Sequence, residues 1–416
     1  MFILSVSGMR AYAVYSRERP GFGSHPLRER TNSKFLLTRW LFLLFGFFFW
    51  TYAGKLIHQG QALNQIAVPV FSCPFNLDQT LESSCYYLTH LPVLFTRNWG
   101  YIICFLATLF LICYTFPLPR NLANILAQMK ADGLQLLNKY GRKRFIGISM
   151  GLPGPYIRPV GCAPSEERML VSGFEELSRI NLRIELETAW DMEITTEHDA
   201  KLQAYAEWKT LQKERKNPSG SLIAVGSVGF GIGAGIIIGG KIVEGQLGVA
   251  GEIGHMGINF NGKYSAGQNQ GTYEYAAGTD SAVRYMRERL YEFPDSPLSD
   301  DSSYQEILSA YHSGDPLAVY AVHKMAWMLG YGLANMIYML NPDCIRIETD
   351  YPNSPEFLQK VEESVQRFVL PEIVETISIT CSELRENAIL LGGYYLILDR
   401  LFEENMFLDR IKQVLS

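Results

Sequence analysis

The residues most able to do chemistry are concentrated between positions 148 and 278. In this part of the chain, the run 226–256 carries glycines at alternate positions of a strand, a turn and a second strand: Gly229, Gly231, Gly233 and Gly235. Alternating glycines let a backbone turn tightly and bring its N–H groups against an anion, so the run is a weak signal for phosphate binding. A tight hairpin with close sheet packing gives the same pattern, and for an isolated glycine ladder we favour that interpretation.

Three short runs rich in acidic side chains and histidine flank this hairpin: Glu197–Ala200, Gly251–His255 and Gly271–Glu274. A Gly-Leu-Pro-Gly-Pro turn precedes them at Gly151–Pro155. Together these motifs resemble those of the ROK family, which unites sugar-responsive transcriptional repressors with sugar kinases. The resemblance covers residues 115–416. It implies an α/β protein with the two-lobed actin-like sugar-kinase fold, in which the cleft between the lobes holds a sugar.

The resemblance assigns sugar contact to a small set of polar side chains: Asp199, Glu252, His255 and Glu274, with His198 beside them. Sugar hydroxyls donate and accept hydrogen bonds, and a misplaced hydroxyl leaves a buried polar group without a partner. In the kinases of the family, the residue that matches Asp199 is the general base that takes a proton from the sugar. The alternatives are a helix N-cap for Asp199 and a solvated turn for Glu252 and His255; we favour sugar contact.

The chain departs from the family in the zinc loop that follows His255. The family carries three cysteines there, and gapless extension from His255 places those positions at Ser265, Gly267 and Thr272. These residues cannot supply the thiolates of a structural tetrahedral site, so we expect no metal. Packing and hydrogen bonds must hold the loop instead, and Tyr264 and Tyr273 are the candidates for that role.

The nucleotide side of the family pattern is also incomplete. ROK kinases open with an Asp-Gly-Gly-Thr-type phosphate loop, and residues 1–140 contain no such run. Glu348 and Asp350 stand where paired glycines approach ATP in the family, and two carboxylates there would repel a triphosphate. The pair Gly392-Gly393 survives, which is a weak signal. Because phosphoryl transfer depends on positioned phosphate ligands and metal, we expect a sugar-binding relative without kinase activity and without a cofactor.

Composition and element pattern agree with a folded α/β chain. The 416 residues are 48% hydrophobic and carry a net charge of -5, which excludes wholesale disorder and a polycation that coats nucleic acid. Strands are predicted at 144–150, 182–186, 192–196, 221–227, 234–238, 344–348 and 377–380, and helices at 121–140, 200–212, 281–291, 317–340, 356–368 and 388–402. We expect a first lobe over 116–200, completed by a helix over 388–416, and a second lobe over 201–387.

Residues 1–115 form an atypical basic and apolar region. Residues 1–60 hold eight Lys or Arg against two Glu, and the segments 35–54 and 99–119 are strongly apolar. Because about 20 apolar residues span a bilayer, the two segments are candidates for a transmembrane helical hairpin with both ends inside. Two alternatives stay open, namely buried strands over 101–116 and a degenerate region. The region shows no helix-turn-helix pattern.

Three functions are compatible with these patterns. The first is a cytoplasmic repressor of sugar-utilisation genes, similar to xylose repressors, that senses a monosaccharide and binds operator DNA. The second is an ATP-dependent sugar kinase, similar to glucokinases or fructokinases. The third is a sugar sensor anchored in the membrane through 35–54 and 99–119, with its ROK domain facing the cytoplasm. Seven scattered cysteines favour a reducing compartment, and the self-association common in the family implies a homo-oligomer.

Overall fold

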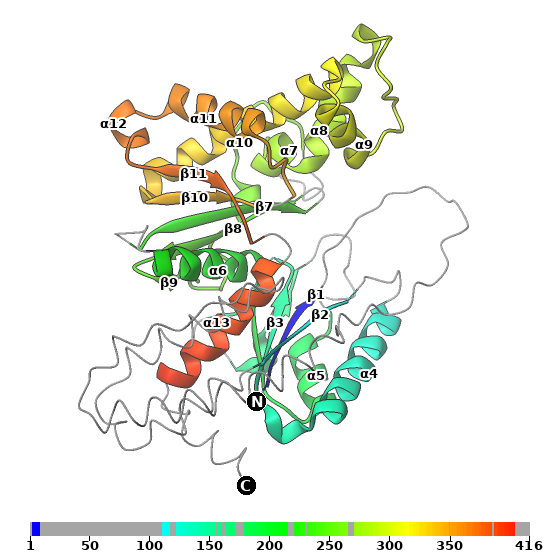
Figure 1. The fold of residues 1–416 in the computed structure, drawn as a ribbon, viewed down its shortest axis with the longest axis vertical. Coiled ribbons are helices and arrows are strands. Elements are labelled where there is room, and N and C mark those ends of the chain that lie inside the picture. Colours follow the sequence, from blue (N-terminus) through cyan, green and yellow to red (C-terminus); the bar gives the residue numbers. More distant parts are fainter. Residues whose placement is uncertain are drawn as a thin grey trace, which may run out of the picture. The chain divides into compact units, whose positions relative to one another are not determined.

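The computed structural model describes most of the chain from residue 122 onward, together with two short segments before it (Figure 1). The described residues are 2–8, 110–116, 122–154, 156–159, 161, 163–170, 179–214, 220–228, 231–264, 270–348, 350–384 and 387–403. Apart from Phe2 and Phe110, all of them belong to one compact unit that comprises 3–14 and 111–410.

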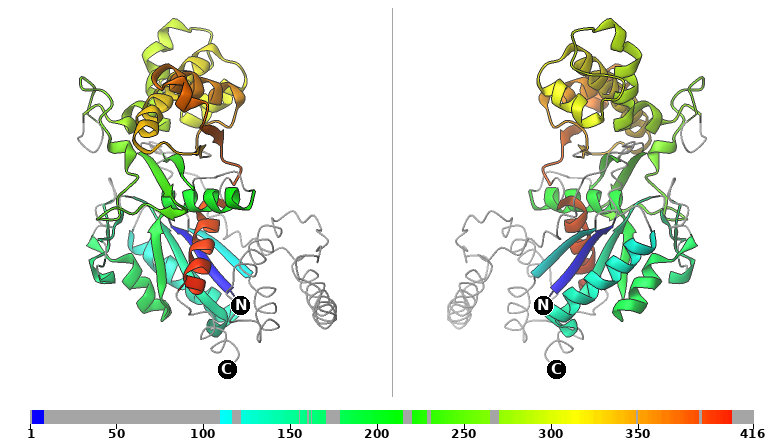
Figure 2. Two further views of the ribbon diagram at one scale, coloured as in Figure 1. Left: turned by 90° about the vertical axis from the view of Figure 1, so that its left-hand side faces the viewer. Right: turned by 90° about the vertical axis from the view of Figure 1, so that its right-hand side faces the viewer.

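The first sheet has four strands in the order β2-β1-β3-β6 (Figure 2). Their bounds are Phe2–Gly8 for β1, Phe110–Phe116 for β2, Phe145–Leu152 for β3 and Ile194–His198 for β6. β3 is buried along almost its whole length, as is typical of a parallel strand covered on both faces. It pairs in parallel with β6, so that Leu152 lies opposite His198. This register brings the polar carboxyl end of β6 next to the turn that follows β3.

Residues 110–116 change the interpretation of the apolar N-terminal region. They form the strand β2 rather than part of a membrane-spanning helix, so the helix prediction over 99–119 is wrong at these residues. The alternative of strands is confirmed there, because Ile, Tyr and Phe favour a sheet and β1 offers a pairing partner. No helix among the described residues is long and apolar enough to cross a membrane. The segment 35–54 and the remainder of 99–119 lie outside the described residues.

Three helices belong with the elements around the first sheet: α4 (Leu122–Tyr140), α5 (Leu182–Trp190) and α13 (Ala388–Glu403). α4 and α13 confirm their predictions, whereas the strand predicted over 182–186 is wrong. Asn181 caps α5 by accepting a hydrogen bond from the backbone N–H of Ile184 at 3.0 Å. Leu182, Leu186 and Trp190, spaced four residues apart, then bury one face of the helix.

The second sheet has five strands in the order β11-β10-β7-β8-β9. Their bounds are Leu222–Val228 for β7, Gly231–Ile238 for β8, Lys241–Ile242 for β9, Cys344–Ile347 for β10 and Ser378–Cys381 for β11. β10 runs parallel to β7 and β11, whereas β7 and β8 form an antiparallel hairpin with Gly226 opposite Gly233. The strands and the hairpin predicted from the sequence are therefore confirmed.

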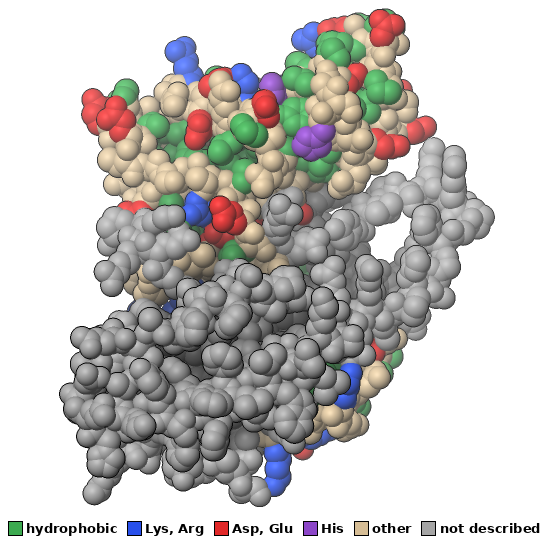
Figure 3. All heavy atoms as spheres, viewed as in Figure 1, with side chains coloured by type: hydrophobic (Ala, Val, Ile, Leu, Met, Phe, Trp, Pro, Cys, Tyr) green, Lys and Arg blue, Asp and Glu red, His purple; other side chains and the backbone are tan. Residues whose placement is uncertain are grey.

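The helices that follow the hairpin build an extensive hydrophobic core with the second sheet. They are α7 (Tyr273–Ala277), α8 (Thr279–Arg289), α9 (Tyr304–His312), α10 (Pro316–Leu340), α11 (Pro355–Phe368) and α12 (Pro371–Val374). α10 begins after the cap Asp315 and ends where Asn341 adopts a left-handed φ of 42°. Its buried side chains pack with residues of the second sheet and of α7, α8, α9 and α11. On the outer surface drawn in Figure 3, acidic, basic and apolar side chains are interspersed over the described residues.

Helix α6 (Asp199–Glu214) packs against both α13 and β8 (Figure 1). Glycines permit both approaches. A Cβ at Gly392 would lie 2.0 Å from the backbone oxygen of Leu202, and a Cβ at Gly235 would lie 2.3 Å from the backbone oxygen of Ala200. The first turn of α6, which carries Asp199, is therefore fixed by close backbone contacts that only a residue without a side chain allows.

Two of the predicted domain boundaries fall inside elements of the structure. The boundary between 115 and 116 lies within β2, and the boundary between 200 and 201 lies within α6. The first sheet also takes β1 from the beginning of the chain. Of the helix expected over 388–416, the structure describes α13 as far as Glu403. The division into lobes at 116–200 and 201–387 stays a prediction.

Candidate functional site

His198 and Asp199 lie at the junction between a strand and a helix. His198 is the last residue of β6, and Asp199 is the first residue of α6. The His198 side chain is 7% exposed and that of Asp199 is 20% exposed. The Asp199 carboxylate accepts a hydrogen bond from the backbone N–H of Ala200 at 2.7 Å. An acidic side chain is stabilised at a helix N-terminus, so the helix-start role considered for Asp199 is compatible with its place in a site.

Glu252 precedes a short 3₁₀ helix, η6 (Ile253–His255), whose position the strand β8 determines. Gly251 has a φ of 98°, which favours glycine, and a Cβ there would lie 2.0 Å from the backbone oxygen of Ala234. The backbone N–H of Ala234 donates to the carbonyl of Gly251 at 2.9 Å. These contacts tie the Gly-Glu-Ile-Gly-His run to β8, the strand on which the first turn of α6 also packs.

The structure brings three of the predicted side chains into direct contact. The Nε2 atom of His198 lies 3.3 Å from Oδ1 of Asp199 and 3.8 Å from Oε1 of Glu252. Gly154, in the turn after β3, adjoins His198 and Glu252, because a Cβ there would lie 2.2 Å from Nε2 of His198 and 2.6 Å from Oε1 of Glu252. The Gly-Leu-Pro-Gly-Pro turn thus contacts the site through a glycine at which a Cβ would displace side chains of His198 and Glu252.

Burial changes the protonation of two of these groups. The pKa of Glu252 is raised to about 7, first by burial and then by the negative charge of Asp199, while Lys201 opposes the rise. Burial also lowers the pKa of His198 to about 4, with the positive charge of Lys201 acting in the same direction. At pH 7 the imidazole is therefore neutral, and Glu252 is poised between its acid and its carboxylate. Such a pair can both donate hydrogen bonds to hydroxyl groups and accept them.

Glu274 and His255 complete the group. Oε1 of Glu274 lies 3.9 Å from Nδ1 of His255, and a Cβ at Gly254 would lie 3.2 Å from Oε2 of Glu274. The charge of Glu274 also contributes to the raised pKa of Glu252. The predicted residues therefore form one connected group, which we call the carboxylate cluster: His198, Asp199, Glu252, His255 and Glu274. That the cluster contacts a sugar stays a prediction.

The loop after the cluster is held partly as predicted. Tyr273 is fully buried, and its hydroxyl donates to a backbone carbonyl of α10 at 2.6 Å. Tyr264 is 68% exposed, so the prediction that its side chain packs the loop is wrong. Thr272 caps α7, while Ser265 and Gly267 lie outside the described residues. Within the described part of the chain, no group of three or more His, Cys, Asp or Glu side chains is arranged to hold a metal ion.

Close packing accounts for two of the hairpin glycines. A Cβ at Gly233 would lie 3.3 Å from the Cβ of Ala200, and Gly235 meets the same first turn of α6. Gly231 begins β8, and Gly229 lies outside the described residues. The interpretation as a closely packed hairpin thus has structural support, and phosphate binding by these glycines stays a prediction.

The residues on the predicted nucleotide side are buried or contact other residues of the fold. Glu348 is 1% exposed, and its Cβ would lie 3.3 Å from a Cβ placed on Gly226. Asp350 accepts a hydrogen bond at its backbone oxygen from the Tyr304 hydroxyl at 3.0 Å. Gly392 lies inside α13, where contact with α6 explains the absence of a side chain. The lack of a nucleotide site on this side of the fold stays a prediction.

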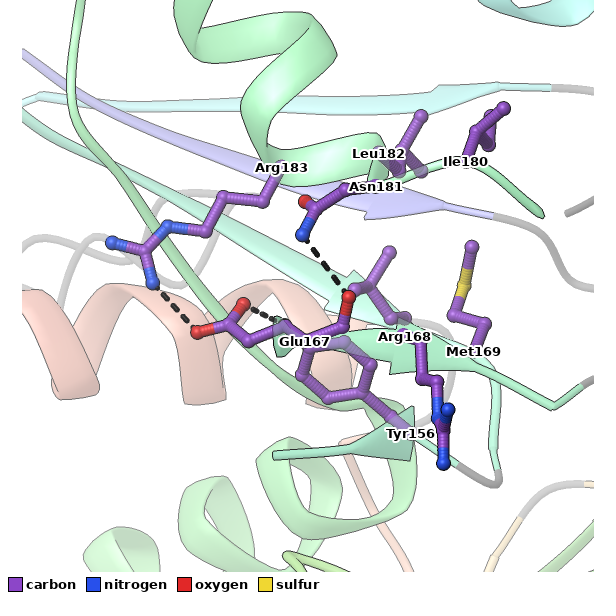
Figure 4. A pocket seen from close by; sticks show the side chains of 9 residues that line it. Tyr156, Glu167, Arg168, Met169, Ile180, Asn181, Leu182 and Arg183 are labelled. Atoms are coloured by element: carbon purple, nitrogen blue, oxygen red, sulfur yellow. Dashed lines mark hydrogen bonds and ion pairs between the residues drawn. The ribbon is translucent and has the colours of Figure 1, made fainter. Parts of the chain in front are cut away.

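A separate pocket lies beside the hairpin of β4 (Tyr156–Ile157) and β5 (Arg168–Met169) and the start of α5 (Figure 4). Its empty volume, including open solvent, is about 180 Å³, and no residue of the carboxylate cluster lines it. Its polar groups bond to one another: Glu167 accepts from the Tyr156 hydroxyl and, at 2.8 Å, from Nη1 of Arg183. These bonds anchor the β4–β5 hairpin and belong to the fold.

The sequence patterns did not single out the charged residues behind the cluster. Lys201 and Arg158 both approach Glu197, with Nζ and Nη2 at 3.9 Å and 2.6 Å from its carboxylate. The spacing of four residues between Glu197 and Lys201 was an available signal, since it pairs opposite charges at the start of a helix. Arg158 had no such signal, because its partner is 39 residues away along the chain.

Comparison with known proteins gives a family match over most of the described chain. A sequence model of the ROK family matches residues 118–400. The xylose repressor of Bacillus subtilis (strain 168) is 25% identical over 262 residues, which cover 63% of each protein. A glucokinase of Halalkalibacterium halodurans is 26% identical over 261 residues, covering 61% of this chain and 76% of that enzyme. The chain thus matches just under two thirds of the repressor's length.

Solved structures share the same fold. A ROK family glucokinase from Streptomyces griseus, in complex with glucose and AMPPNP, superposes with a TM-score of 0.54 at 23% identity, covering 67% of this chain and 88% of the glucokinase. A ROK family transcriptional regulator, described as a homolog of the E. coli MLC protein, gives a TM-score of 0.57 at 22% identity over 70% and 72% of the two chains. The expected α/β fold of the actin-like sugar kinases is therefore confirmed.

Proposed function

Because this chain belongs to the ROK family, we propose that it is a sugar-sensing transcriptional regulator, which binds a monosaccharide at the carboxylate cluster and does not phosphorylate it. One observation carries the proposal. His198 lies within 4 Å of both Asp199 and Glu252, which come from separate parts of the chain. Sugars are recognised by converging carboxylate and imidazole groups of this kind, because each can bond to a hydroxyl of defined orientation.

The exposure of the side chains suggests which of them contact the sugar and which of them support those contacts. Asp199 and Glu252 are each 20% exposed, whereas His198 is covered. The two acidic groups would therefore contact the sugar, and the neutral imidazole would hold them. An ionised carboxylate accepts hydrogen bonds from two hydroxyls, and a protonated Glu252 donates one. A sugar epimer with one hydroxyl misplaced would leave one of these groups without a partner, which supplies selectivity.

The similar proteins include both regulators and kinases, so the choice between these two functions must rest on features of this chain. The imidazole of His198 sits against the carboxylate of Asp199, which is the base in the alternative of a sugar kinase. The buried Glu348 adds a carboxyl group on the predicted nucleotide side. Both features favour a binding protein over phosphoryl transfer, which needs a free base and ligands for phosphate and metal.

A regulator of this kind would respond because the sugar binds one of two conformations more tightly and shifts the balance between them. The affinity of the other conformation for operator DNA would differ. Residues 9–109, where a DNA reader would lie, are outside the described residues. Operator DNA and a second copy of the chain stay predicted partners.

Calorimetric titration of the full chain with D-xylose, D-glucose, D-fructose and N-acetyl-D-glucosamine tests the proposal. We expect binding of at least one sugar with an affinity that ATP and Mg²⁺ do not change, and no phosphorylated product. Asp199→Asn should weaken that binding about tenfold, because it removes a charged acceptor. The matched change Asp295→Asn, at an exposed position outside the cluster, should have no effect.

Two other outcomes contradict the proposal. If none of the sugars binds, the carboxylate cluster is not a site for these monosaccharides. If a phosphorylated sugar forms and Asp199→Asn abolishes its formation, the chain is a kinase. Recovery of the intact chain in the soluble fraction after lysis would exclude the membrane-anchored alternative.

A further inference from the structure

Lys201 is a lysine buried among charged and backbone partners directly behind the carboxylate cluster. It is 1% exposed and lies in the first turn of α6, two residues after Asp199. Its Nζ donates a hydrogen bond to the carbonyl of Gly248 at 2.6 Å and lies 3.9 Å from Oε1 of Glu197. A buried ammonium group is strongly destabilising without such partners, so this side chain depends on the loop that carries Gly248.

That loop, residues 243–251, leads directly into Glu252. A second cation holds it: the guanidinium of Arg158 lies 3.1 Å from Glu244 and 2.6 Å from Glu197. The backbone N–H of Arg158 donates to the carbonyl of Leu247 at 2.9 Å. Two cations thus contact the loop, one of them through Glu244 of the loop itself, and Glu197 is shared between the cations.

Gly248 adapts the loop to these contacts. Its φ of 74° favours glycine, and a Cβ at this position would lie 3.0 Å from the backbone oxygen of Arg158. The same backbone turn presents the Gly248 carbonyl to Lys201. The loop is therefore contacted directly by Lys201 of α6 and by Arg158, and Glu197 pairs with both of these cations.

From these contacts we infer that Lys201 is a positioning residue of the proposed sugar site: its ammonium group ties the 243–251 loop to α6 and so holds Glu252 in register with Asp199. The inference rests on the proposed function for the ligand, but the tie itself is independent of any ligand. Lys201 touches the loop and not the sugar.

The charge of Lys201 adds a second effect that packing alone would not have. The charged or titratable groups that act on Glu252 are Asp199 and Lys201 of α6, Glu274 of α7 and His198 of β6. Burial, Asp199 and Glu274 raise the pKa of Glu252, and Lys201 lowers it. Removal of the ammonium group should therefore raise the pKa of Glu252 further. A sugar site that needs ionised Glu252 would then require a higher pH.

The test uses Lys201→Met, which keeps an aliphatic side chain but removes the donor and the charge. The matched control is Lys209→Met on the same helix, where the ammonium group pairs with Asp399 of α13 at 2.9 Å. Amide hydrogen exchange of the full chain, read by mass spectrometry, should become about tenfold faster across residues 243–251 in Lys201→Met, since a charge-assisted hydrogen bond is lost. Lys209→Met should leave exchange in that segment unchanged.

Titration with D-xylose and D-glucose between pH 5.5 and pH 9 gives the second readout. Lys201→Met should bind about tenfold more weakly at pH 7 and shift the midpoint of the pH dependence upward, and Lys201→Arg should restore the midpoint because it restores the charge. Unchanged exchange in 243–251, or weaker binding with an unchanged midpoint in a folded Lys201→Met protein, overturns the inference. If that variant does not fold, Lys201→Arg with a displaced midpoint overturns it instead. If wild-type protein binds neither sugar, the proposed sugar specificity fails, while the exchange result still decides whether Lys201 ties the loop.

Discussion

Replacement of Glu252 by Gln should make the protein more stable at alkaline pH while it weakens the proposed site. The pKa of Glu252 is raised from 4.5 to about 7. Between these values the folded protein holds a proton that the unfolded chain has released, so the free energy of unfolding falls as pH rises through this window. The shift corresponds to about 3 kcal/mol once the pH exceeds 7. Glu252→Gln carries no charge and escapes this loss.

His198 acts in the opposite direction, which makes the expected pattern specific. Its pKa is lowered from 6.5 to about 4, so between these values the unfolded chain binds a proton that the folded protein does not. Stability therefore rises with pH from 4 to 6.5, again by about 3 kcal/mol. In the wild type the two slopes nearly cancel between pH 4.5 and 6.5. Glu252→Gln leaves the His198 slope alone, and His198→Asn leaves the Glu252 slope alone.

Thermal melting of the full chain from pH 4 to pH 8 measures these slopes. Glu252→Gln should match the wild type near pH 4 and melt on the order of 5 °C higher at pH 8. Glu288→Gln is the control, because Glu288 is half exposed, pairs with Lys324 at 3.1 Å and lies outside the cluster. Glu288→Gln should not melt at a higher temperature than the wild type at pH 8. A Glu252→Gln difference that is the same at pH 4 and pH 8 would refute the reasoning about burial.

Two glycine substitutions should distinguish an effect on sugar affinity from an effect on the stability of the fold. Gly154→Ala should reduce sugar affinity more than about tenfold with little change in melting temperature, because its Cβ would displace the imidazole of His198 and the carboxylate of Glu252. Calorimetric titration measures the affinity, and an unchanged affinity contradicts the placement of this turn. Gly392→Ala should lower the free energy of unfolding by about 2–3 kcal/mol, because its Cβ would meet the backbone of Leu202 and force α13 away from α6. Denaturant unfolding measures this free energy, and a change below about 0.5 kcal/mol would show that the two helices are not in close contact.

The local patterns of the sequence predicted most of the elements, and the family resemblance named the residues of the carboxylate cluster. Helical periodicity determines α4, α10 and α11 within a residue or two, because each carries apolar residues at helical spacing. The alternating glycines mark the hairpin of β7 and β8, and the Gly-Glu-Ile-Gly-His run identifies the turn with Glu252 and His255. These signals are local, so a single sequence contains them.

Contacts between distant residues were decided by the tertiary structure. The strand over 182–186 was predicted from its local pattern. The segment is instead a helix that buries Trp190, whose indole N–H donates to the carbonyl of Lys130 at 3.1 Å. β1 and β2 pair although more than 100 residues separate their starting positions, and no local pattern encodes such pairing.

The charged residues behind the cluster show the same limit. By sequence, only the spacing of four residues from Glu197 distinguishes Lys201 from an exposed lysine of a helix. Only the folded chain places the carbonyl of Gly248 against its ammonium group and buries both. The sequence by itself determined which acidic and imidazole groups are present and on which turns they lie. Their mutual distances and their protonation follow from burial and from charges that come together only in three dimensions.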